Sequence, residues 1–180
     1  MSGPLEGLLV LDLSWILSGP FCSLTLADLG AEVIKIEQPI VGDKARGNGP
    51  FVGGHSSYFM GINRGKQSIA LDISKSKGKN IFIELVKQAD VVLENFRPGV
   101  MSRLGLGYEV LKKHNSRLIY AAISGFGQTG PYADRPALDV IVQGMGGMLS
   151  VTGDVGGAPV RPGASIGDIT ASLYTAIGIL

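Results

Sequence analysis

The sequence of 180 residues predicts an α/β fold, with a Rossmann-like parallel sheet flanked by helices. Two observations predict this fold. Short apolar runs rich in β-branched residues alternate with segments of helical periodicity over residues 8–124. These runs do not alternate with polar residues, which is typical of strands buried on both faces. Since 45% of the residues are hydrophobic, the chain can fill one substantial core.

The first elements form a predicted β-α-β unit. Residues 8–13 and residues 31–37 are short apolar runs and predict two strands. Between them, residues 21–29 carry apolar side chains at helical spacing and stop at Gly30, a residue well suited to the end of a helix. A helical crossover of this length makes the two strands parallel.

The same alternation continues to residue 124. Residues 75–89 predict an amphipathic helix whose polar face carries lysines. Residues 90–94 predict a third strand, residues near 108–114 a further helix, and residues 117–124 a fourth strand. Strands and helices in this order favour a parallel sheet that is covered on both faces.

The pattern changes after residue 124. Residues 125–136 and residues 152–163 predict long loops, a kind of segment that often carries function. A helix is expected from Asp139 onward, and residues 168–180 form an element that is apolar on most sides. Because such a helix lacks a polar face and a terminal cap, we expect the chain to be the front part of a longer protein.

Composition excludes several classes of protein. Sixteen Lys and Arg against fifteen Asp and Glu leave a net charge of +1, which disfavours a general nucleic-acid binder. The single Cys22 excludes an internal disulfide, and two distant histidines, His55 and His114, cannot build a zinc site. No apolar run reaches the roughly 18 residues that cross a bilayer, and the first residues lack a basic stretch followed by an apolar one, so we expect no export. We therefore expect a cytoplasmic protein, or one in an organelle matrix if a targeting segment was removed.

The first strand and helix invite a dinucleotide-binding interpretation, because Glu37 ends the second strand where an acidic residue would meet a ribose. The loop between Asp12 and the helix disagrees. It holds one glycine, Gly19, where the phosphate fingerprint needs glycine at three positions. The sequence therefore does not favour nicotinamide or flavin binding.

A first candidate site follows the third strand. Asn95 offers an amide donor and acceptor, Phe96 a flat apolar face, and Arg97 and Arg103 cationic forks suited to phosphate. Open α/β sheets bind ligands at this edge. The alternative is an ordinary strand exit with a Pro-Gly turn and solvated arginines. The residue types alone do not choose between the two.

A second candidate is Asp168, at the start of the last apolar element. Asp is a preferred N-cap residue, so a purely structural role is one interpretation. The other is that a carboxylate at a helix N-terminus serves as a nucleophile toward a carbonyl, with Gly163 and Gly167 leaving room for an acyl group. Sequence physics leaves both open.

Three other residues are expected to be mainly structural. Cys22 is expected to be a small buried residue, and His55 to lie on a surface loop. Trp15 is expected to pack in the core, with a place in the wall of a ligand pocket as the alternative.

These features belong to a series of motifs whose order and spacing are specific. The series comprises Leu5-Glu6-Gly7, Val10-Leu11-Asp12, Gly19-Pro20, residues 29–37, Gly42-Asp43, residues 63–69, Leu71-Asp72, residues 94–99 and Gly167-Asp168. Taken together, it resembles the class III CoA-transferase family, the group of the formyl-CoA transferase and carnitine CoA-transferase type. The same superfamily contains the α-methylacyl-CoA racemases.

The resemblance implies an architecture larger than this chain. Residues 1–180 would form the N-terminal part of the CoA-binding, Rossmann-like large domain of a two-domain fold, in which two chains interlock as a homodimer. The small domain and the returning C-terminal segment would be absent from this chain. The partners implied are acyl-CoA and organic acid substrates, with no nucleic acid and no membrane.

The resemblance also implies the chemistry. Asp168 would attack the thioester carbonyl of an acyl-CoA and form an aspartyl anhydride, then an aspartyl-CoA thioester, from which an acceptor carboxylate takes the CoA. A carboxylate suits this exchange because it can both attack and leave. CoA is then a substrate rather than a tightly bound cofactor, and no metal is required.

Positions that match the family imply the following CoA contacts. Those expected near the nucleotide are Gln38, Leu71, Asp72, Ile73 and Ser74; those at the strand exit are Asn95, Phe96 and Arg97, with Arg103 as a phosphate partner; those near the thioester are Leu17, Ser18, Arg135, Pro136, Ala137 and Leu138.

Four of these positions depart from formyl-CoA transferases, which carry glutamine at Leu17, arginine at Gln38, lysine at Pro136 and tyrosine at Leu138. Formyl or oxalyl transfer is therefore put in doubt, and another pair of acids is favoured.

Two alternatives to CoA transfer remain. A 2-methylacyl-CoA racemase of the same superfamily would carry histidine where Leu138 precedes Asp139, and without that group one side of the proton exchange lacks an acid or base. The other alternative is a CoA-binding fragment that is inactive without the rest of the chain. The apolar end, residues 177–180, motivates it because exposed apolar surface needs a cover.

Overall fold

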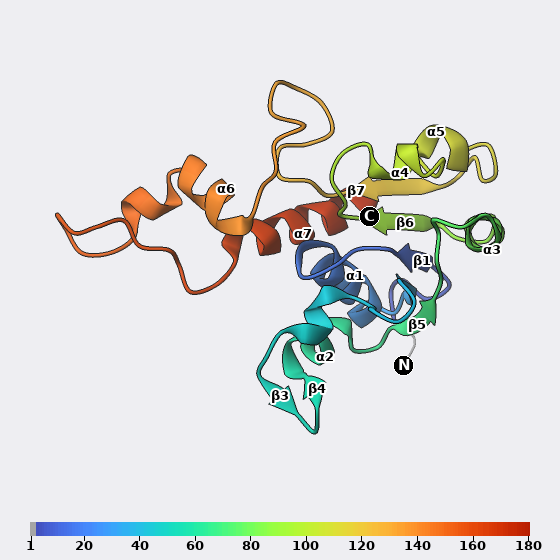
Figure 1. The fold of residues 1–180 in the computed structure, drawn as a ribbon, viewed down its shortest axis with the longest axis horizontal. Coiled ribbons are helices and arrows are strands. Elements are labelled where there is room, and N and C mark those ends of the chain that lie inside the picture. The colour runs from blue at the N-terminus through green and yellow to red at the C-terminus, as the bar shows by residue number, and fades with distance from the viewer. Residues whose placement is uncertain (1–2) are drawn as a thin grey trace.

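The computed structural model describes residues 3–180 and confirms the α/β fold. Its centre is a five-stranded sheet in the order β5-β2-β1-β6-β7, and all four neighbouring pairs are parallel (Figure 1). The strands are β1 (Leu9–Asp12), β2 (Glu32–Glu37), β5 (Gln67–Ala70), β6 (Val91–Glu94) and β7 (Ile119–Ala122). The chain leaves β1 toward one edge of the sheet and later returns to β6 on the other side of β1, as in doubly wound folds.

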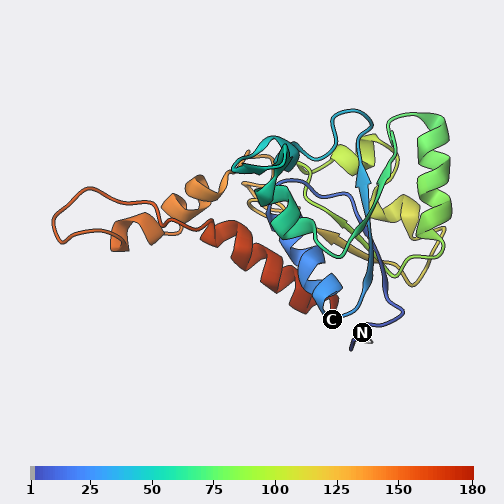
Figure 2. The ribbon, with the colours of Figure 1, turned by 90° about the horizontal axis from the view of Figure 1, so that it is seen from below.

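Helices cover both faces of the sheet (Figure 2). On one face lie α1 (Ser18–Asp28) and α7 (Ile166–Ile179), and on the other lie α3 (Ser76–Val86), α4 (Val100–Arg103) and α5 (Tyr108–Leu111). Two apolar clusters correspond to these two faces. Val10, Val33 and Leu93 pack with α1 and α7, whereas Leu11 and Val92 pack with α3, α4 and α5. The central strands β1 and β6 are therefore buried on both sides, which explains their apolar runs.

The remaining elements lie outside the sheet. They are η1 (Lys44–Gly47), the hairpin of β3 (Phe51–Val52) and β4 (His55–Ser56), α2 (Ser57–Asn63), α6 (Asp139–Met145) and η2 (Met148–Val151). Residues 139–165, here called the arm, project away from the sheet (Figures 1 and 2). No helix within residues 3–180 is long and apolar enough to span a membrane.

Several sequence-based boundaries were wrong by a few residues. The first helix begins at Ser18 rather than at residue 21, the third helix spans Ser76–Val86 rather than 75–89, and the last begins at Ile166 rather than 168. The fourth predicted strand shrinks to Ile119–Ala122. Helix ends fray and strand ends depend on pairing, neither of which a local pattern records.

A buried cluster of charges lies at the carboxyl ends of β1 and β2. Lys35 Nζ lies 2.9 Å from Asp43 Oδ2 and 3.9 Å from Asp12 Oδ2, and Lys66 Nζ lies 3.2 Å from the same Asp12 oxygen. All four side chains are at most 2% exposed. Burial alone would raise the pKa of Asp12, but Lys35 and Lys66 lower it to about 2.

Among residues 3–180, two residues other than glycine have a left-handed backbone, Ile16 at φ 66° and Ile40 at φ 72°. This region is sterically costly for β-branched residues. Ile16 belongs to the loop after β1, where its N–H donates to Asp43 Oδ1 at 3.1 Å. Ile40 is fully exposed, so its side chain brings no packing that offsets the strain.

We therefore expect Ile40→Asn to stabilise the protein by about 1 kcal/mol, because Asn tolerates the left-handed region far better than a β-branched residue. Urea unfolding measures the change. Val155→Asn is the control, since Val155 is equally exposed but has an ordinary φ, and it should change the free energy of unfolding by less than about 0.5 kcal/mol. Equal effects of the two substitutions would contradict the strain at Ile40.

Candidate active site

A cavity of about 1120 Å³ opens at the carboxyl ends of the parallel strands. Its walls come from the carboxyl ends of the strands and the segments that leave them: residues 13–18 after β1, residues 36–38 at the end of β2, residues 71–74 after β5, residues 95–98 after β6 and residues 123–125 after β7. Residues 135–142 and the start of α7 complete it. Since β1 and β6 are the strands between which the chain reverses direction, the cavity lies at the switch point where open α/β sheets bind ligands.

Every site residue predicted from the sequence lines this cavity, except one. The lining residues are Leu17, Ser18, Gln38, Leu71, Asp72, Ile73, Ser74, Asn95, Phe96, Arg97, Arg135, Pro136, Ala137, Leu138 and Asp168. Arg103 does not line it. That residue is exposed at the end of α4, although Val100 and Leu104 on either side of it do line the cavity. The structure thus brings together residues from six separate segments, and their binding roles stay predictions.

Asn95 is a structural clamp as well as a lining residue. Its Oδ1 accepts the Trp15 N–H at 2.8 Å, and its Nδ2 donates to the Trp15 carbonyl at 2.8 Å and to Ser18 Oγ at 3.1 Å. Phe96 packs edge-on against the Trp15 ring at 5.5 Å between centroids. The amide of Asn95 is therefore fully engaged by protein groups, and its effect on a ligand is to shape the wall. Trp15 lines the cavity, so the pocket alternative was correct.

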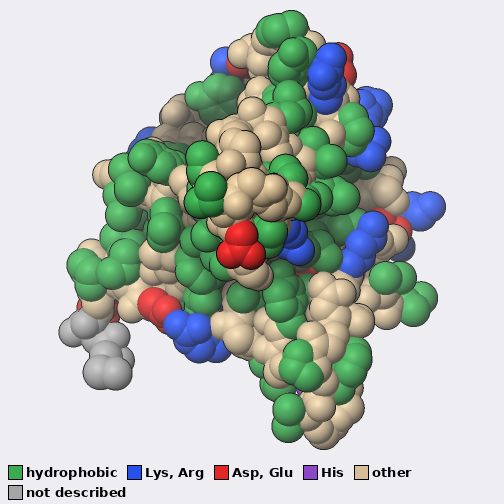
Figure 3. All heavy atoms as spheres, turned by 90° about the vertical axis from the view of Figure 1, so that its left-hand side faces the viewer, with side chains coloured by type: hydrophobic (Ala, Val, Ile, Leu, Met, Phe, Trp, Pro, Cys, Tyr) green, Lys and Arg blue, Asp and Glu red, His purple; other side chains and the backbone are tan. Residues whose placement is uncertain are grey.

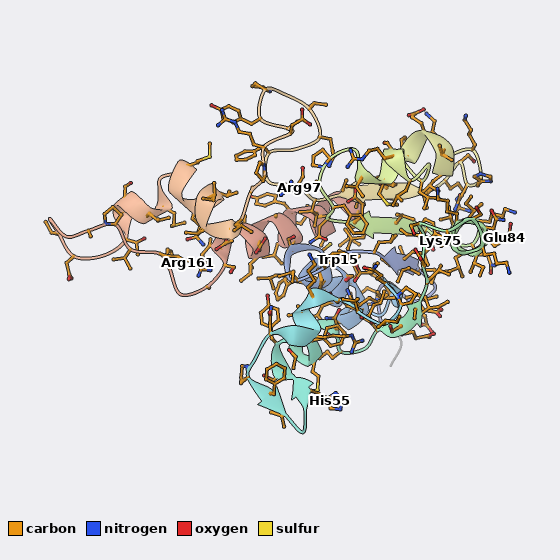
Figure 4. All side chains as sticks on the ribbon, in the orientation of Figure 1. Trp15, His55, Lys75, Glu84, Arg97 and Arg161 are labelled. Carbon is orange, nitrogen blue, oxygen red and sulfur yellow. The ribbon has the colours of Figure 1, made fainter. Side chains whose placement is uncertain are left out.

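Three cationic side chains line the cavity. Arg97 lies just after β6, and the stick view places both Arg97 and Trp15 near the centre of the molecule (Figure 4). Arg135 stacks on the ring of Tyr132 at 4.0 Å, and Lys44 Nζ lies 5.1 Å from the centre of the Trp15 ring. Lys44 was not predicted as a site residue, although it follows the end of β2 by a few residues, and strand ends of this kind carry ligand contacts. Together these cations suit a ligand that carries phosphates.

Glu37 lines the cavity but is committed to protein groups. Arg46 donates to both carboxylate oxygens at 2.7 Å, Ser68 Oγ donates at 2.6 Å and the Asp43 N–H at 2.9 Å. Burial would raise the pKa of Glu37, but these hydrogen bonds, led by that of Arg46, lower it to about 2. The carboxylate therefore has no acceptor left for a ribose.

His55 and Cys22 lie away from the cavity. His55 is exposed on the β3–β4 hairpin, far from Trp15 and Arg97 (Figure 4). Cys22 is completely buried in α1, and burial raises the pKa of its thiol to about 12. Both expectations are confirmed. Within residues 3–180, no group of three or more His, Cys, Asp or Glu side chains is arranged to hold a metal ion.

The N-cap interpretation of Asp168 was wrong. Asp168 is the third residue of α7, and Ser165 occupies the cap position without a side-chain bond. The capping group is instead Asp139, whose Oδ1 accepts the N–H of Gly167 at 2.9 Å and, more weakly, that of Asp168 at 3.4 Å. This approach favours glycine at 167, because a Cβ there would lie 3.1 Å from Asp139 Oδ1 and the carboxylate would have to shift.

Asp139 is itself held by side chains of the arm. Its Oδ2 accepts from Gln143 Nε2 at 2.6 Å and from Arg161 Nη2 at 3.3 Å. Burial would raise the pKa of Asp139, but the hydrogen bond from Gln143, followed by those from Asp168, Arg161 and Gly167, keeps it below its usual value. Sequence analysis singled out neither Arg161 nor Gln143, since no local pattern links them to Asp139.

Asp168 has the opposite electrostatic environment. It is partly buried and lines the cavity. Burial raises its pKa, the charge of Asp139 raises it further, and Arg161 partly lowers it. A carboxylate with a raised pKa, facing a cavity and held by a helix backbone, can act as a nucleophile toward an electrophilic carbon.

The outer end of the arm is apolar at its surface. The view along the arm shows hydrophobic side chains spread over this face (Figure 3). The exposed apolar residues of the arm include Ile141, Met145, Met148, Val151 and Val155. A surface of this kind marks an interaction site in many proteins.

Comparison with known proteins agrees on one family. Residues 5–180 match the family model described as CoA-transferase family III. An acetyl-CoA:oxalate CoA-transferase of Acetobacter aceti is 53% identical over 178 residues, which covers 98% of this chain and 46% of that protein. A succinyl-CoA:glutarate CoA-transferase of Homo sapiens is 46% identical over 172 residues, covering 95% of this chain and 39% of that protein.

A solved structure gives the same result. The crystal structure of a CAIB/BAIF family protein from Brucella suis superimposes with a TM-score of 0.95 at 46% identity, over 99% of this chain and 48% of that one. The chain thus spans less than half the length of each of these three relatives.

The geometry around Asp139 makes a prediction about charge. Asp139→Asn keeps the oxygen that caps α7 but removes a negative charge, so the pKa of Asp168 should fall toward its ordinary value. Arg161→Gln removes a positive charge and should raise the pKa of Asp168. Carboxyl-carbon NMR titration of the Asp168 side chain measures both. A shift in the same direction for both variants would contradict the charge coupling.

Proposed function

Because the chain belongs to CoA-transferase family III, we propose that the protein moves CoA from an acyl-CoA thioester to an acceptor carboxylic acid, with Asp168 as the nucleophile. One observation carries this proposal. Asp168 lines the same cavity as the strand-exit residues that the family resemblance assigns to CoA. At about 1120 Å³, the cavity lies at the upper end of the volumes usual for ligand pockets, as a ligand as large as CoA requires.

The first half of the proposed reaction transfers CoA to the protein. A carboxylate oxygen of Asp168 attacks the thioester carbonyl, the carbon–sulfur bond breaks, and CoA leaves as its thiolate. The thiolate then attacks the side-chain carbonyl of the resulting aspartyl anhydride. The donor acid leaves as a carboxylate, and Asp168 is left as a CoA thioester.

The second half runs the same steps with the acceptor. The acceptor carboxylate attacks the carbonyl of the aspartyl thioester. This step releases the CoA thiolate and leaves a second anhydride, between the acceptor and Asp168. Attack of the thiolate on the acceptor's carbonyl gives the new acyl-CoA and frees Asp168. Since every step exchanges a carboxylate and a thiolate, neither a metal nor a net proton transfer is needed, and the raised pKa of Asp168 favours its attack.

The proposed orientation of CoA follows the segments of the cavity wall. Residues 71–74, with Gln38, take the adenosine part, and residues 95–97 lie beneath the pantetheine and the nucleotide. Residues 135–138, with Leu17 and Ser18, surround the thioester next to Asp168. Arg103, outside the cavity, can reach only a phosphate that projects from it.

The names of the relatives indicate the class of acid. They are named for oxalate, glutarate, mesaconate and malate, with succinyl-CoA as the donor in several, and all of these acids are dicarboxylic. We therefore propose that at least one of the two acids is a dicarboxylate. A relative named for oxalate is 53% identical, so the departures at Leu17 and Leu138 do not by themselves exclude oxalate.

Racemisation is not favoured. Leu138 lines the cavity beside Asp139 and cannot exchange a proton, so one face of an α-carbon lacks an acid or base. The cytoplasmic location and the interlocked homodimer stay proposals. The family match supports the dimer, and the exposed apolar side chains of the arm provide surface that a second chain can cover. The same surface suits the fragment alternative, in which activity needs further polypeptide.

A covalent trap tests the nucleophile. We expect incubation with succinyl-CoA or acetyl-CoA, followed by hydroxylamine, to give a hydroxamate on the peptide that carries Asp168, detected by mass spectrometry. Asp168→Asn should abolish the adduct and CoA exchange while CoA still binds. Asp154→Asn, in an exposed loop outside the cavity, is the matched control and should leave both unchanged. Exchange at the normal rate in Asp168→Asn would refute the assignment.

Phosphate recognition separates the two arginines. Arg97→Ala should weaken binding of both CoA and dephospho-CoA about tenfold, the effect of one lost charged hydrogen bond. Arg103→Ala should weaken CoA but leave dephospho-CoA unchanged if it meets the 3′-phosphate. Titration calorimetry measures both, with the exposed Arg117→Ala as control. Equal losses for the two ligands in Arg103→Ala would contradict the proposed contact.

A further inference from the structure

A second, smaller cavity lies at the end of β6, beside α4 and α5. Its volume is about 390 Å³, and it shares no lining residue with the larger cavity. The residues around it are Glu94, Gly99, Met101, Ser102, Gly107, Tyr108, Tyr120, Ala122 and Gln128. Glu94, the last residue of β6, is therefore the one acidic group in its wall.

Glu94 is a buried carboxylate without a cation. It is 5% exposed, and within residues 3–180 no Lys, Arg or His lies at ion-pair distance from it. Its Oε2 accepts the Phe96 N–H at 2.7 Å and its Oε1 the Tyr120 hydroxyl at 3.3 Å. Burying an unpaired carboxylate costs free energy, which its hydrogen bonds must offset.

The Phe96 hydrogen bond connects Glu94 to the active-site wall. The peptide bond between Asn95 and Phe96 joins two residues that both contact Trp15. The Asn95 amide binds the Trp15 backbone, and the Phe96 ring packs on the Trp15 ring. The N–H of this peptide bond is fixed from behind by Glu94. A rotation of this peptide would move both contacts at once, and with them the wall formed by residues 13–18.

We propose that Glu94 is a positioning residue for the CoA site: by holding the Phe96 N–H, its carboxylate keeps Asn95 and Phe96 against Trp15. Glu94 lines only the smaller cavity, so it acts through these residues and touches no substrate. The part of the inference that concerns CoA rests on the proposed function, whereas the part that concerns Trp15 does not.

The position of Glu94 also makes the wall sensitive to pH. Burial raises the pKa of Glu94 to about 7, although the hydrogen bonds from Phe96 and Tyr120 oppose the rise. The titratable groups that face it are Tyr120 of β7 and Tyr108 of α5, and burial keeps the pKa of Tyr120 above its ordinary value. An ionised acceptor binds an N–H more strongly than a neutral one, so the clamp is tighter above neutral pH than below it.

Three variants test the proposal through the KM for acyl-CoA and the Kd for CoA. Glu94→Ala removes the acceptor and should raise both about tenfold, with a smaller change in kcat because Asp168 is untouched. Glu94→Gln keeps an oxygen acceptor without the charge, so it should give values near those of the unmodified protein at low pH, below those of Glu94→Ala. Ser102→Ala, in the same small cavity but without a bond to Phe96, is the matched control.

The pH profile separates positioning from a merely structural role. In the unmodified protein, KM should rise about fivefold as the pH falls from roughly 8 to 6, whereas in Glu94→Gln it should stay flat across this range. Tyr120→Phe removes a bond that lowers the pKa of Glu94, so its midpoint should move to higher pH. A pH profile identical in Glu94→Gln and the unmodified protein would overturn the proposal.

The fluorescence of Trp15, the single tryptophan of the 180 residues, tests the clamp without CoA. Its emission should change with a midpoint near pH 7 in the unmodified protein and stay constant in Glu94→Gln. If this change occurs but CoA does not bind, the proposed function fails while the clamp stands. If CoA binds and neither the emission nor the KM depends on Glu94, the clamp fails while the function stands. Should Glu94→Ala not fold, Glu94→Gln and Tyr120→Phe decide the question.

Discussion

The buried charge cluster of Asp12, Lys35, Asp43 and Lys66 is the constraint on which the rest of the site depends. Lys35 also donates to the Ser14 carbonyl at 2.8 Å, and Lys66 to the Pro20 carbonyl at 2.9 Å, so the cluster joins β1, β2, the loop after β1 and the first turn of α1. Removing one partner of such a buried ion pair leaves an uncompensated charge and lowers the free energy of unfolding by about 3–5 kcal/mol. The loop that shapes the cavity therefore cannot relax without disturbing the centre of the sheet.

This constraint explains how the loop tolerates an unusual backbone. Ile16 is held at φ 66° because Asp43 binds its N–H on one side and Asn95 binds the neighbouring Trp15 on the other. Gly19 allows the same loop to close, since a Cβ there would lie 2.0 Å from the Ser14 side chain. Strain of this kind persists only where the surroundings over-determine it, and it gathers at functional sites. The cavity wall is thus fixed both by the lining residue Asn95 and by Asp43, which lies outside the cavity.

The sequence predicted the parts of this architecture that carry a local pattern. Strands β1, β2, β6 and β7 are apolar runs, and the Asn95 and Asp168 segments were recognisable by their place beyond strand or helix ends. The edge strand β5 was missed because it has only four residues, most of them exposed. Its sequence therefore shows neither an apolar run nor alternation. The role of Asn95 as a clamp, and the pairing of Asp139 with Arg161, depend on contacts 80 and 22 residues apart, which no local signal contains.

Two carboxylates at the start of α7 have different roles: Asp139 caps the helix, and Asp168 is the proposed nucleophile. A helix N-terminus stabilises an anion and so lowers the pKa and the nucleophilicity of a carboxylate that caps it. Here Asp139 accepts the free N–H groups and keeps a low pKa, while Asp168, in the first turn of α7, is left with burial and a neighbouring negative charge. Environments that push the pKa values of two adjacent acids apart are typical of sites that assign them different roles. Because Arg161 binds the capping acid and not Asp168, the arm can hold the helix end without neutralising the group that faces the cavity.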